Sequence, residues 1–204
     1  MIIAIDIDQV LADTTQPIID FYNKKLNASV ILDENFSYAL FKNWNLEKED
    51  SLKIVDEFIA NESINIEPID GAIEAISKLK EKGFRLFAVT ARPRIHENIT
   101  KEWINRHFGD DTFFEIISTN QYNDPNEAKK SYFLKEFGAS MIIDDNPYNC
   151  EECFDNGFNA ILFNMNNQYP WGKTNNEKIQ KVTSWDEVLN NIQIQKEVLL
   201  QKNL

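Results

Sequence analysis

The sequence predicts an α/β fold in which a doubly wound parallel sheet carries a small helical insert after its first strand. Short apolar runs rich in β-branched residues alternate with helical stretches along most of the chain. Between residues 27 and 65 this alternation gives way to clustered aromatic residues and helical periodicity. Strands that alternate with helices form a parallel sheet covered on both faces, so the aromatic segment is an insertion into that pattern.

The strands are predicted from short apolar runs. Residues 2–7 are rich in isoleucine, which is typical of a strand buried on both faces. Further strands are expected over residues 84–89, 113–118, 141–143 and 160–163.

The helices are predicted from apolar residues at helical spacing and from glycines that end them. Residues 15–26 carry such a stripe, residues 72–82 end at Gly83, and residues 126–137 end at Gly138. The remaining expected elements are a helix over 97–108, one after Pro147, a terminal helix over 185–198 and a long surface loop over 164–176.

Composition limits the classes of partner. The 204 residues fit one domain with a small insert, and 33 acidic against 21 basic residues give a net charge of -12. Duplex nucleic acid is therefore not an expected partner, because binding to phosphates needs a basic surface. The charge is expected to keep the surface self-repelling and soluble.

The expected setting is the cytoplasm. The two cysteines, Cys150 and Cys153, offer no disulfide framework and are expected to pack in the interior. The N-terminus lacks the features of a signal sequence, and no apolar run approaches the roughly 20 residues of a membrane helix. No membrane partner is expected, and a homodimer is an oligomeric state that the sequence allows without requiring it.

Chemically active side chains follow the predicted strands. Ligands of open α/β sheets bind beyond the carboxyl ends of the strands. The residues at those ends, with a lysine pair near the start of a helix, are Asp6, Asp8, Thr90, Arg92, Asp144, Asp145, Lys129 and Lys130.

The acidic residues among them point to a cation. Asp6 and Asp8 are two apart on an extended segment, so their side chains point to the same side. Two carboxylates at such a short distance repel one another unless a cation or a shared proton intervenes. Asp144 and Asp145 strengthen that argument. Because all the candidate ligands are oxygens, a hard ion such as Mg²⁺ is favoured.

The ordered set of motifs resembles the haloacid-dehalogenase-like superfamily of phosphatases over nearly the whole chain. The motifs are residues 6–13 (DIDQVLAD), residues 89–93 (VTARP), Lys130 ahead of Phe137 and Gly138, and residues 142–147 (IIDDNP). Asp70-Gly71-Ala72 before a helix, and Trp103 in the helix after the second motif, resemble the 5'(3')-deoxyribonucleotidase branch.

This resemblance implies catalytic roles. Asp6 would attack phosphorus and form an aspartyl-phosphate, while Asp8 would protonate the leaving alcohol and then activate water. Thr90, together with Ala91 and the backbone amides there, would hold the phosphoryl oxygens. Lys130 would neutralise the developing charge.

The resemblance also implies a Mg²⁺ site. Its ligands would be the Asp6 carboxylate, the Asp8 backbone carbonyl and Asp145, with Asp144 as close support. The sequence departs from the superfamily at Gln9, where glycine is common because the turn there resists other residues. Gln9 removes no catalytic group, and its side chain is a candidate to reach the substrate.

The resemblance divides the chain into a catalytic core, residues 1–13 and 70–204, and a helical cap, residues 14–69. A cap at this position would close over the site and select the leaving group. Phe41 and Trp44 flank a predicted turn, and one of the two is expected to stack on a base.

Arg92 has two open roles. It either contacts the phosphate or sugar of the substrate, or it forms a salt bridge beside the cleft.

Three functions are compatible with these residues. The first is Mg²⁺-dependent hydrolysis of nucleoside monophosphates, deoxyribonucleotides included, through an aspartyl-phosphate. The second keeps this chemistry but acts on a sugar phosphate or another small metabolite phosphate. The third is a phosphate-binding or receiver-like regulatory module, which would release no inorganic phosphate.

Overall fold

The computed structural model describes residues 1–121, 124 and 126–202. At its centre is a six-stranded sheet in the order β3-β2-β1-β4-β5-β6, in which every neighbouring pair is parallel. Its strands are β1 (Ile2–Ile5), β2 (Arg85–Thr90), β3 (Phe113–Ser118), β4 (Met141–Asp144), β5 (Asn159–Phe163) and β6 (Gln180–Val182).

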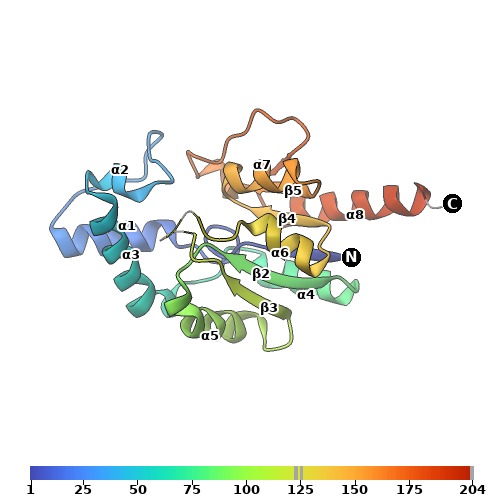
Figure 1. The fold of residues 1–204 in the computed structure, drawn as a ribbon, viewed down its shortest axis with the longest axis horizontal. Coiled ribbons are helices and arrows are strands. Elements are labelled where there is room, and N and C mark those ends of the chain that lie inside the picture. The colour runs from blue at the N-terminus through green and yellow to red at the C-terminus, as the bar shows by residue number, and fades with distance from the viewer. Residues whose placement is uncertain (122–123, 125, 203–204) are drawn as a thin grey trace.

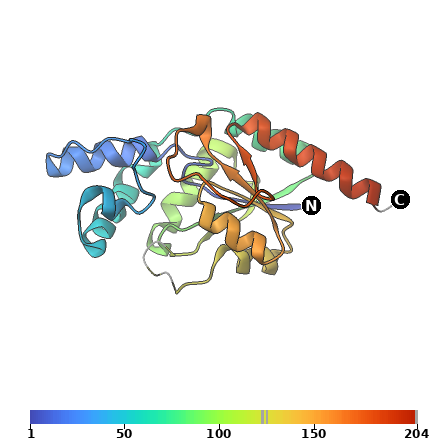
Figure 2. The same cartoon turned by 90° about the horizontal axis from the view of Figure 1, so that it is seen from above.

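Helices cover both faces of this sheet (Figures 1 and 2). On one face lie α4 (Ala72–Glu81), α5 (Glu97–Phe108) and α8 (Trp185–Lys202); on the other lie α6 (Lys130–Phe137) and α7 (Pro147–Asp155). The prediction of a doubly wound parallel sheet is confirmed.

The strand sequences explain the two layers. In β1 the side chains of Ile3 and Ile5 enter the apolar cluster beneath α4 and α8, whereas Ala4 enters the cluster beneath α6 and α7. Alternation places successive side chains on opposite faces, and a strand covered on both faces is apolar at every position. Cys150 and Cys153 of α7 are buried in the second cluster, as expected.

The helical insert, residues 14–69, lies at the end of the molecule opposite α8 (Figures 1 and 2). It contains α1 (Thr15–Leu26), α2 (Leu40–Trp44), α3 (Lys48–Asn61) and the 3-10 helix η1 (Ser63–Asn65). Aromatic rings hold it together: Tyr22 stacks on Trp44 at 4.4 Å between centroids, and Phe21 meets Phe58 edge-on at 5.7 Å.

Strand β1 ends at Ile5 instead of residue 7, helix α8 ends at Lys202 instead of residue 198, and two further elements differ from prediction. Helix α6 begins at Lys130, four residues later than expected, because the Asp124 side chain accepts the Asn126 amide and offers the backbone an alternative to the helix. The short strand β6 lies just beyond the predicted surface loop, and its three residues are too few to show an alternating pattern. The remaining 3-10 helices are η2 (Arg94–His96) and η3 (Met165–Asn167).

None of the described helices combines the length and apolar character needed to cross a bilayer.

Candidate active site

The carboxyl ends of three adjacent strands meet at the centre of the sheet. Asp6 directly follows β1, Thr90 ends β2 and Asp144 ends β4. The Asp6 amide donates to the Ile143 carbonyl at 2.9 Å, which ties the start of the first motif to β4. The site therefore occupies the place in the topology where ligands of open α/β sheets bind.

Lys130 joins two of these acids. It is the first residue of α6 and is 1% exposed, with its Nζ 2.8 Å from Asp6 Oδ1 and 2.8 Å from Asp144 Oδ2. Burial alone would lower the pKa of Lys130, but Asp144 and Asp6 outweigh that effect and raise it. The ammonium is therefore charged, and it offsets part of the repulsion between the two carboxylates.

Asp6 is poised to change its protonation state near neutral pH. Burial raises its pKa to about 7, against the lowering effect of Lys130, while Asp144 and Asp8 add to the rise. A further positive charge at the site would favour the carboxylate form, in which Asp6 can act as a nucleophile.

Asp6, Asp144 and Asp145 form a buried acidic cluster in which one ligand oxygen of each lies within 4.8 Å of the others. Both carboxylate oxygens of Asp144 have hydrogen-bond partners. Besides the bond from Lys130, Asp144 accepts one from the Asn146 backbone amide at 2.9 Å and others from the Asn149 side chain at 3.2 Å.

Only one of the two carboxylate oxygens of Asp145 has a hydrogen-bond partner among the described residues. Its Oδ2 accepts the indole N–H of Trp171 at 2.7 Å, whereas its Oδ1 is buried without a hydrogen-bond partner in the described part of the chain. Burial, with Asp144 and Asp6, raises the pKa of Asp145 well above its usual range. An orphaned carboxylate oxygen beside two further acids suits a hard divalent cation. This arrangement fits Asp145 as a direct ligand and Asp144 as its support.

Asp8 is held by Arg92. The Arg92 Nε lies 2.9 Å from Asp8 Oδ2 and its Nη2 2.7 Å from Oδ1, a bidentate pair. Thr90 Oγ1 donates to Asp8 at 3.4 Å and accepts the Arg92 amide at 3.2 Å. Of the two roles open for Arg92, the structure contains the salt bridge beside the cleft.

Gln9 adopts the turn that glycine would make easily. Its φ is 60°, in the left-handed region, and its amide donates to the Ala12 carbonyl at 2.8 Å. The Gln9 side-chain amide donates to the hydroxyl of Thr14, and both residues line the cavity above Asp6. The departure from glycine therefore leaves the turn intact and adds a polar group to the cavity wall.

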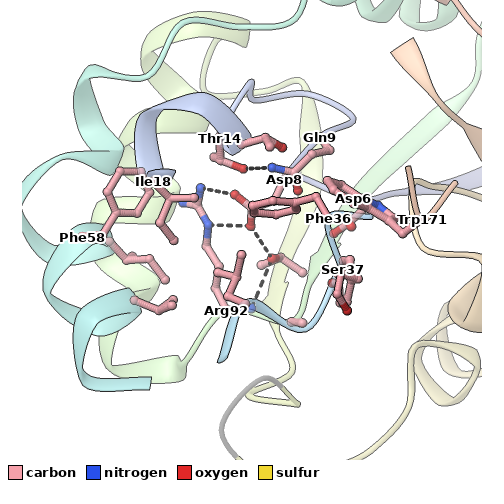
Figure 3. Close-up of a pocket in the computed structure, with 17 residues that line it drawn as sticks. Asp6, Asp8, Gln9, Thr14, Ile18, Phe36, Ser37, Phe58, Arg92 and Trp171 are labelled. Atoms are coloured by element: carbon pink, nitrogen blue, oxygen red, sulfur yellow. Dashed lines mark hydrogen bonds and ion pairs between the residues drawn. The ribbon is translucent and has the colours of Figure 1, made fainter. Parts of the chain in front are cut away.

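An open cavity lies beside these residues (Figure 3). The first and second motifs contribute Asp6, Asp8, Thr90, Ala91 and Arg92. The helical insert contributes most of the remainder, including Ile18, Phe36, Ser37, Tyr38, Leu40 and Phe58. Trp171, from the segment between β5 and β6, completes the wall.

The structure thus brings together most of the side chains singled out in the sequence, but it separates the two candidate aromatics. Phe41 lines a second cavity, which shares Tyr38, Leu40 and Ala91 with the first. Trp44 is 3% exposed in the core of the insert, stacked on Tyr22, and lines neither cavity. Its ring is already covered, so Trp44 is excluded as a surface for stacking a base.

Four aromatic residues at the cavity were not expected. Phe36 and Tyr38 precede α2, Phe58 lies in α3, and Trp171 lies in a segment predicted as plain surface loop. Burial raises the pKa of Tyr38 well above its usual value, and the charges of Asp145, Asp6 and Asp144 add to that rise. The available signal for Trp171 was an aromatic pair, Tyr169 and Trp171, in an otherwise polar segment beyond the end of a strand.

Comparison with known proteins agrees with this geometry. A Bacillus cereus protein named as a nucleotidase on a provisional basis is 27% identical over 194 residues, covering 90% of this chain and 93% of that protein. A predicted phosphatase from Clostridium acetobutylicum superposes with a TM-score of 0.67 at 16% identity, over 94% of this chain and 97% of the other.

A haloacid dehalogenase (HAD) family hydrolase from Deinococcus radiodurans, solved with bound phosphate and sodium, superposes with a TM-score of 0.64 at 11% identity. That match covers 91% of this chain and 92% of the other. The model of the 5' nucleotidase, deoxy (pyrimidine), cytosolic type C protein family matches residues 1–198. The chain therefore belongs to that nucleotidase family and is a phosphatase of the haloacid-dehalogenase-like superfamily.

Proposed function

We propose that this protein is a Mg²⁺-dependent phosphomonoesterase that hydrolyses nucleoside monophosphates, deoxyribonucleotides included, through an aspartyl-phosphate on Asp6. One observation carries the proposal. A single cavity is lined both by the carboxylates of Asp6 and Asp8 and by the aromatic residues Phe36, Tyr38 and Phe58 of the insert. A phosphate held at the acids would place its leaving group among those rings.

In the first step an oxygen of Asp6 attacks phosphorus while the bond from phosphorus to the ester oxygen breaks. Asp8 gives its proton to that oxygen, so the alcohol leaves neutral. Thr90 and the backbone at Ala91 hold the phosphoryl oxygens at the end of β2, and the Lys130 ammonium balances their charge.

In the second step Asp8, now a carboxylate, takes a proton from a water molecule. That water attacks the aspartyl-phosphate, inorganic phosphate leaves and the Asp6 carboxylate is restored. In the structure Arg92 donates to both oxygens of the Asp8 carboxylate, which is the form that Asp8 takes in this step, and so holds it in place.

Asp6, Asp145 and the Asp8 backbone carbonyl would hold the Mg²⁺, with Asp144 supporting them through its contacts to Lys130 and Asn149. Bound there, the cation supplies positive charge that offsets the repulsion between an anionic nucleophile and an anionic phosphate. The half-satisfied Asp145 carboxylate supports this assignment.

The helical insert acts as the cap that selects the leaving group, with residues 1–13 and 70–204 as the catalytic core. Phe36 and Tyr38 line the cavity and would contact a base, since aromatic rings are good surfaces for base stacking. Phe41 borders the adjoining cavity, where a larger leaving group would extend. The names of the family and of the Bacillus cereus relative support a nucleotide as the substrate.

The experiment is release of inorganic phosphate from a panel of nucleoside monophosphates and sugar phosphates, with Mg²⁺ or with EDTA. Wild type is compared with Asp6→Asn, a near-isosteric variant that cannot act as the nucleophile. We expect Mg²⁺-dependent release that prefers nucleotides and is lost in Asp6→Asn.

Release from sugar phosphates alone would keep the chemistry and reject the nucleotide. The absence of any Asp6-dependent release would reject the enzyme and favour a phosphate-binding module.

A further inference from the structure

Trp171 reaches from the segment between β5 and β6 to the acidic cluster. Its indole N–H donates to Asp145 Oδ2 at 2.7 Å, while Asp145 Oδ1 has no hydrogen-bond partner among the described residues. The two oxygens of one carboxylate are therefore distinguished: one is fixed by the protein and the other is left for a ligand. Groups that orient a metal ligand in this way commonly tune its affinity for the metal.

The segment that carries Trp171 is held on both sides by Asn164. The Asn164 side chain accepts the Tyr169 amide at 2.8 Å and donates to the carbonyls of Tyr169 at 2.9 Å and Gly172 at 3.3 Å. A Cβ at Gly172 would lie 2.5 Å from Asn164 Nδ2, so any other residue there would force the Asn164 side chain to shift. Trp171 thus sits in a clamped turn within the long loop.

The Trp171 ring is also packed. It stacks on Tyr169 at 5.3 Å with a 4° angle between planes, and it contacts Phe36 at 6.2 Å and Tyr38 at 6.0 Å. Phe36 and Tyr38 belong to the helical insert, so the same ring that fixes Asp145 also touches the proposed cap. Figure 3 shows Trp171 beside Asp6 at the cavity wall.

We propose that Trp171 is a positioning residue for the metal site: its N–H holds one oxygen of Asp145 and thereby presents the other to the Mg²⁺. This inference rests on the proposed function, because it takes the acidic cluster to be a Mg²⁺ site. The packed ring holds Trp171 in place, and its N–H orients the Asp145 carboxylate.

The test separates those two parts. Trp171→Phe keeps an aromatic ring on Tyr169 and removes the N–H. A matched control is Trp103→Phe, which also removes one buried indole N–H bond, to the Ile66 carbonyl at 2.7 Å, but away from the acidic cluster. Binding of MgCl₂ to the metal-stripped proteins is measured by titration calorimetry, without substrate.

We expect Trp171→Phe to weaken Mg²⁺ binding about tenfold, in the range found for groups that orient metal ligands, and Trp103→Phe to bind as wild type does. Tryptophan emission gives a second readout. Trp44, Trp103 and Trp185 are each no more than 3% exposed, so the change in wild-type emission on adding Mg²⁺ should come from Trp171 and vanish in Trp171→Phe.

Equal Mg²⁺ affinity of wild type and Trp171→Phe, or an equal loss in Trp103→Phe, would overturn this inference and leave the proposed function standing. A wild-type protein that binds no Mg²⁺ would overturn both.

Discussion

Arg92 and Asp8 form a bidentate ion pair, with nitrogen-to-oxygen distances of 2.9 and 2.7 Å, between the ends of β2 and β1. Arg92 is 3% exposed and its Nη1 also lies 3.4 Å from the hydroxyl of Thr100 in α5, so it is anchored in the core. Asp8 is therefore presented to the cavity by a rigid cation, which a flexible ammonium would replace poorly.

Replacement of Arg92 by Lys should therefore impair turnover more than binding. A single ammonium cannot grip both oxygens of Asp8, and misplacing a general acid–base group costs about 100-fold in kcat, while the KM stays near that of wild type. Steady-state kinetics on the best nucleotide measures both constants. Arg94→Lys is the control, because Arg94 pairs with Glu127 at the surface. A KM that rises with kcat unchanged would instead assign Arg92 to substrate binding.

Lys130→Met should destabilise the metal-free protein by about 3 kcal/mol, because it leaves Asp6 and Asp144 as buried acids without their cation. Urea denaturation monitored by circular dichroism measures this. Lys135→Met on the same helix removes an exposed lysine and should change the free energy of unfolding by no more than about 0.5 kcal/mol. Equal effects of the two changes would contradict a structural role for the pairing.

The pKa of Asp6 predicts how the stability of the metal-free protein depends on pH. Folding raises this pKa from 3.8 to about 7, so between those values the folded state keeps a proton that the unfolded state has lost. The free energy of unfolding should therefore fall as pH rises from about 4 to about 7 and then level off. Asp6→Asn removes this titration, and its decline over the same window should be shallower. Parallel profiles for the two proteins would refute the assignment.

Phe36→Leu should raise the KM for a nucleoside monophosphate about tenfold, the order expected for losing one ring that stacks on a base, and should leave the KM for glycerol phosphate unchanged. Trp44→Phe is the matched control, because its ring lies in the insert but lines neither cavity. Loss of affinity for both substrates alike would indicate that Phe36 shapes the site without contacting the base.

Gln9→Gly and Gln9→Ala should differ in stability. Both remove the contact with Thr14, but only alanine must still hold a side chain at a φ of 60°. Glycine should be the more stable of the two by about 1 kcal/mol, measured by thermal unfolding. Equal stability would show that the turn relaxes when the side chain is shortened.

The sequence was most informative where reactive side chains stand at the ends of predicted strands. Asp6, Thr90 and Asp144 could be placed together because each closes an apolar run, and ends of parallel strands share one edge. The residues of the cavity wall were harder to predict from the sequence. Whether Phe36 or Trp44 faces the cavity depends on how the helices of the insert pack, and both look alike as aromatics in a helical segment.

Trp171 was missed for a different reason. It owes its position to Asn164 and Gly172, whose side-chain and backbone contacts leave no periodic pattern along the chain. The late start of α6 has a similar origin, because one side chain, Asp124, redirects the backbone before the helix. Hydrophobic periodicity does not reveal such local competition between side-chain and backbone hydrogen bonds.

A hydrogen bond from Trp185, near the C-terminus, stabilises the loop that carries the proposed nucleophile. The Trp185 indole N–H, at the start of α8, donates at 3.0 Å to the carbonyl of Val10, which stands 175 positions earlier. A chain emerging from the ribosome therefore exposes β1 long before its neighbour β4 and the Trp185 fastening exist. Contacts between such distant parts of the chain form slowly. Assembly of the catalytic centre should accordingly be a late event in folding, and a chain truncated before Trp185 should leave the first motif unfastened.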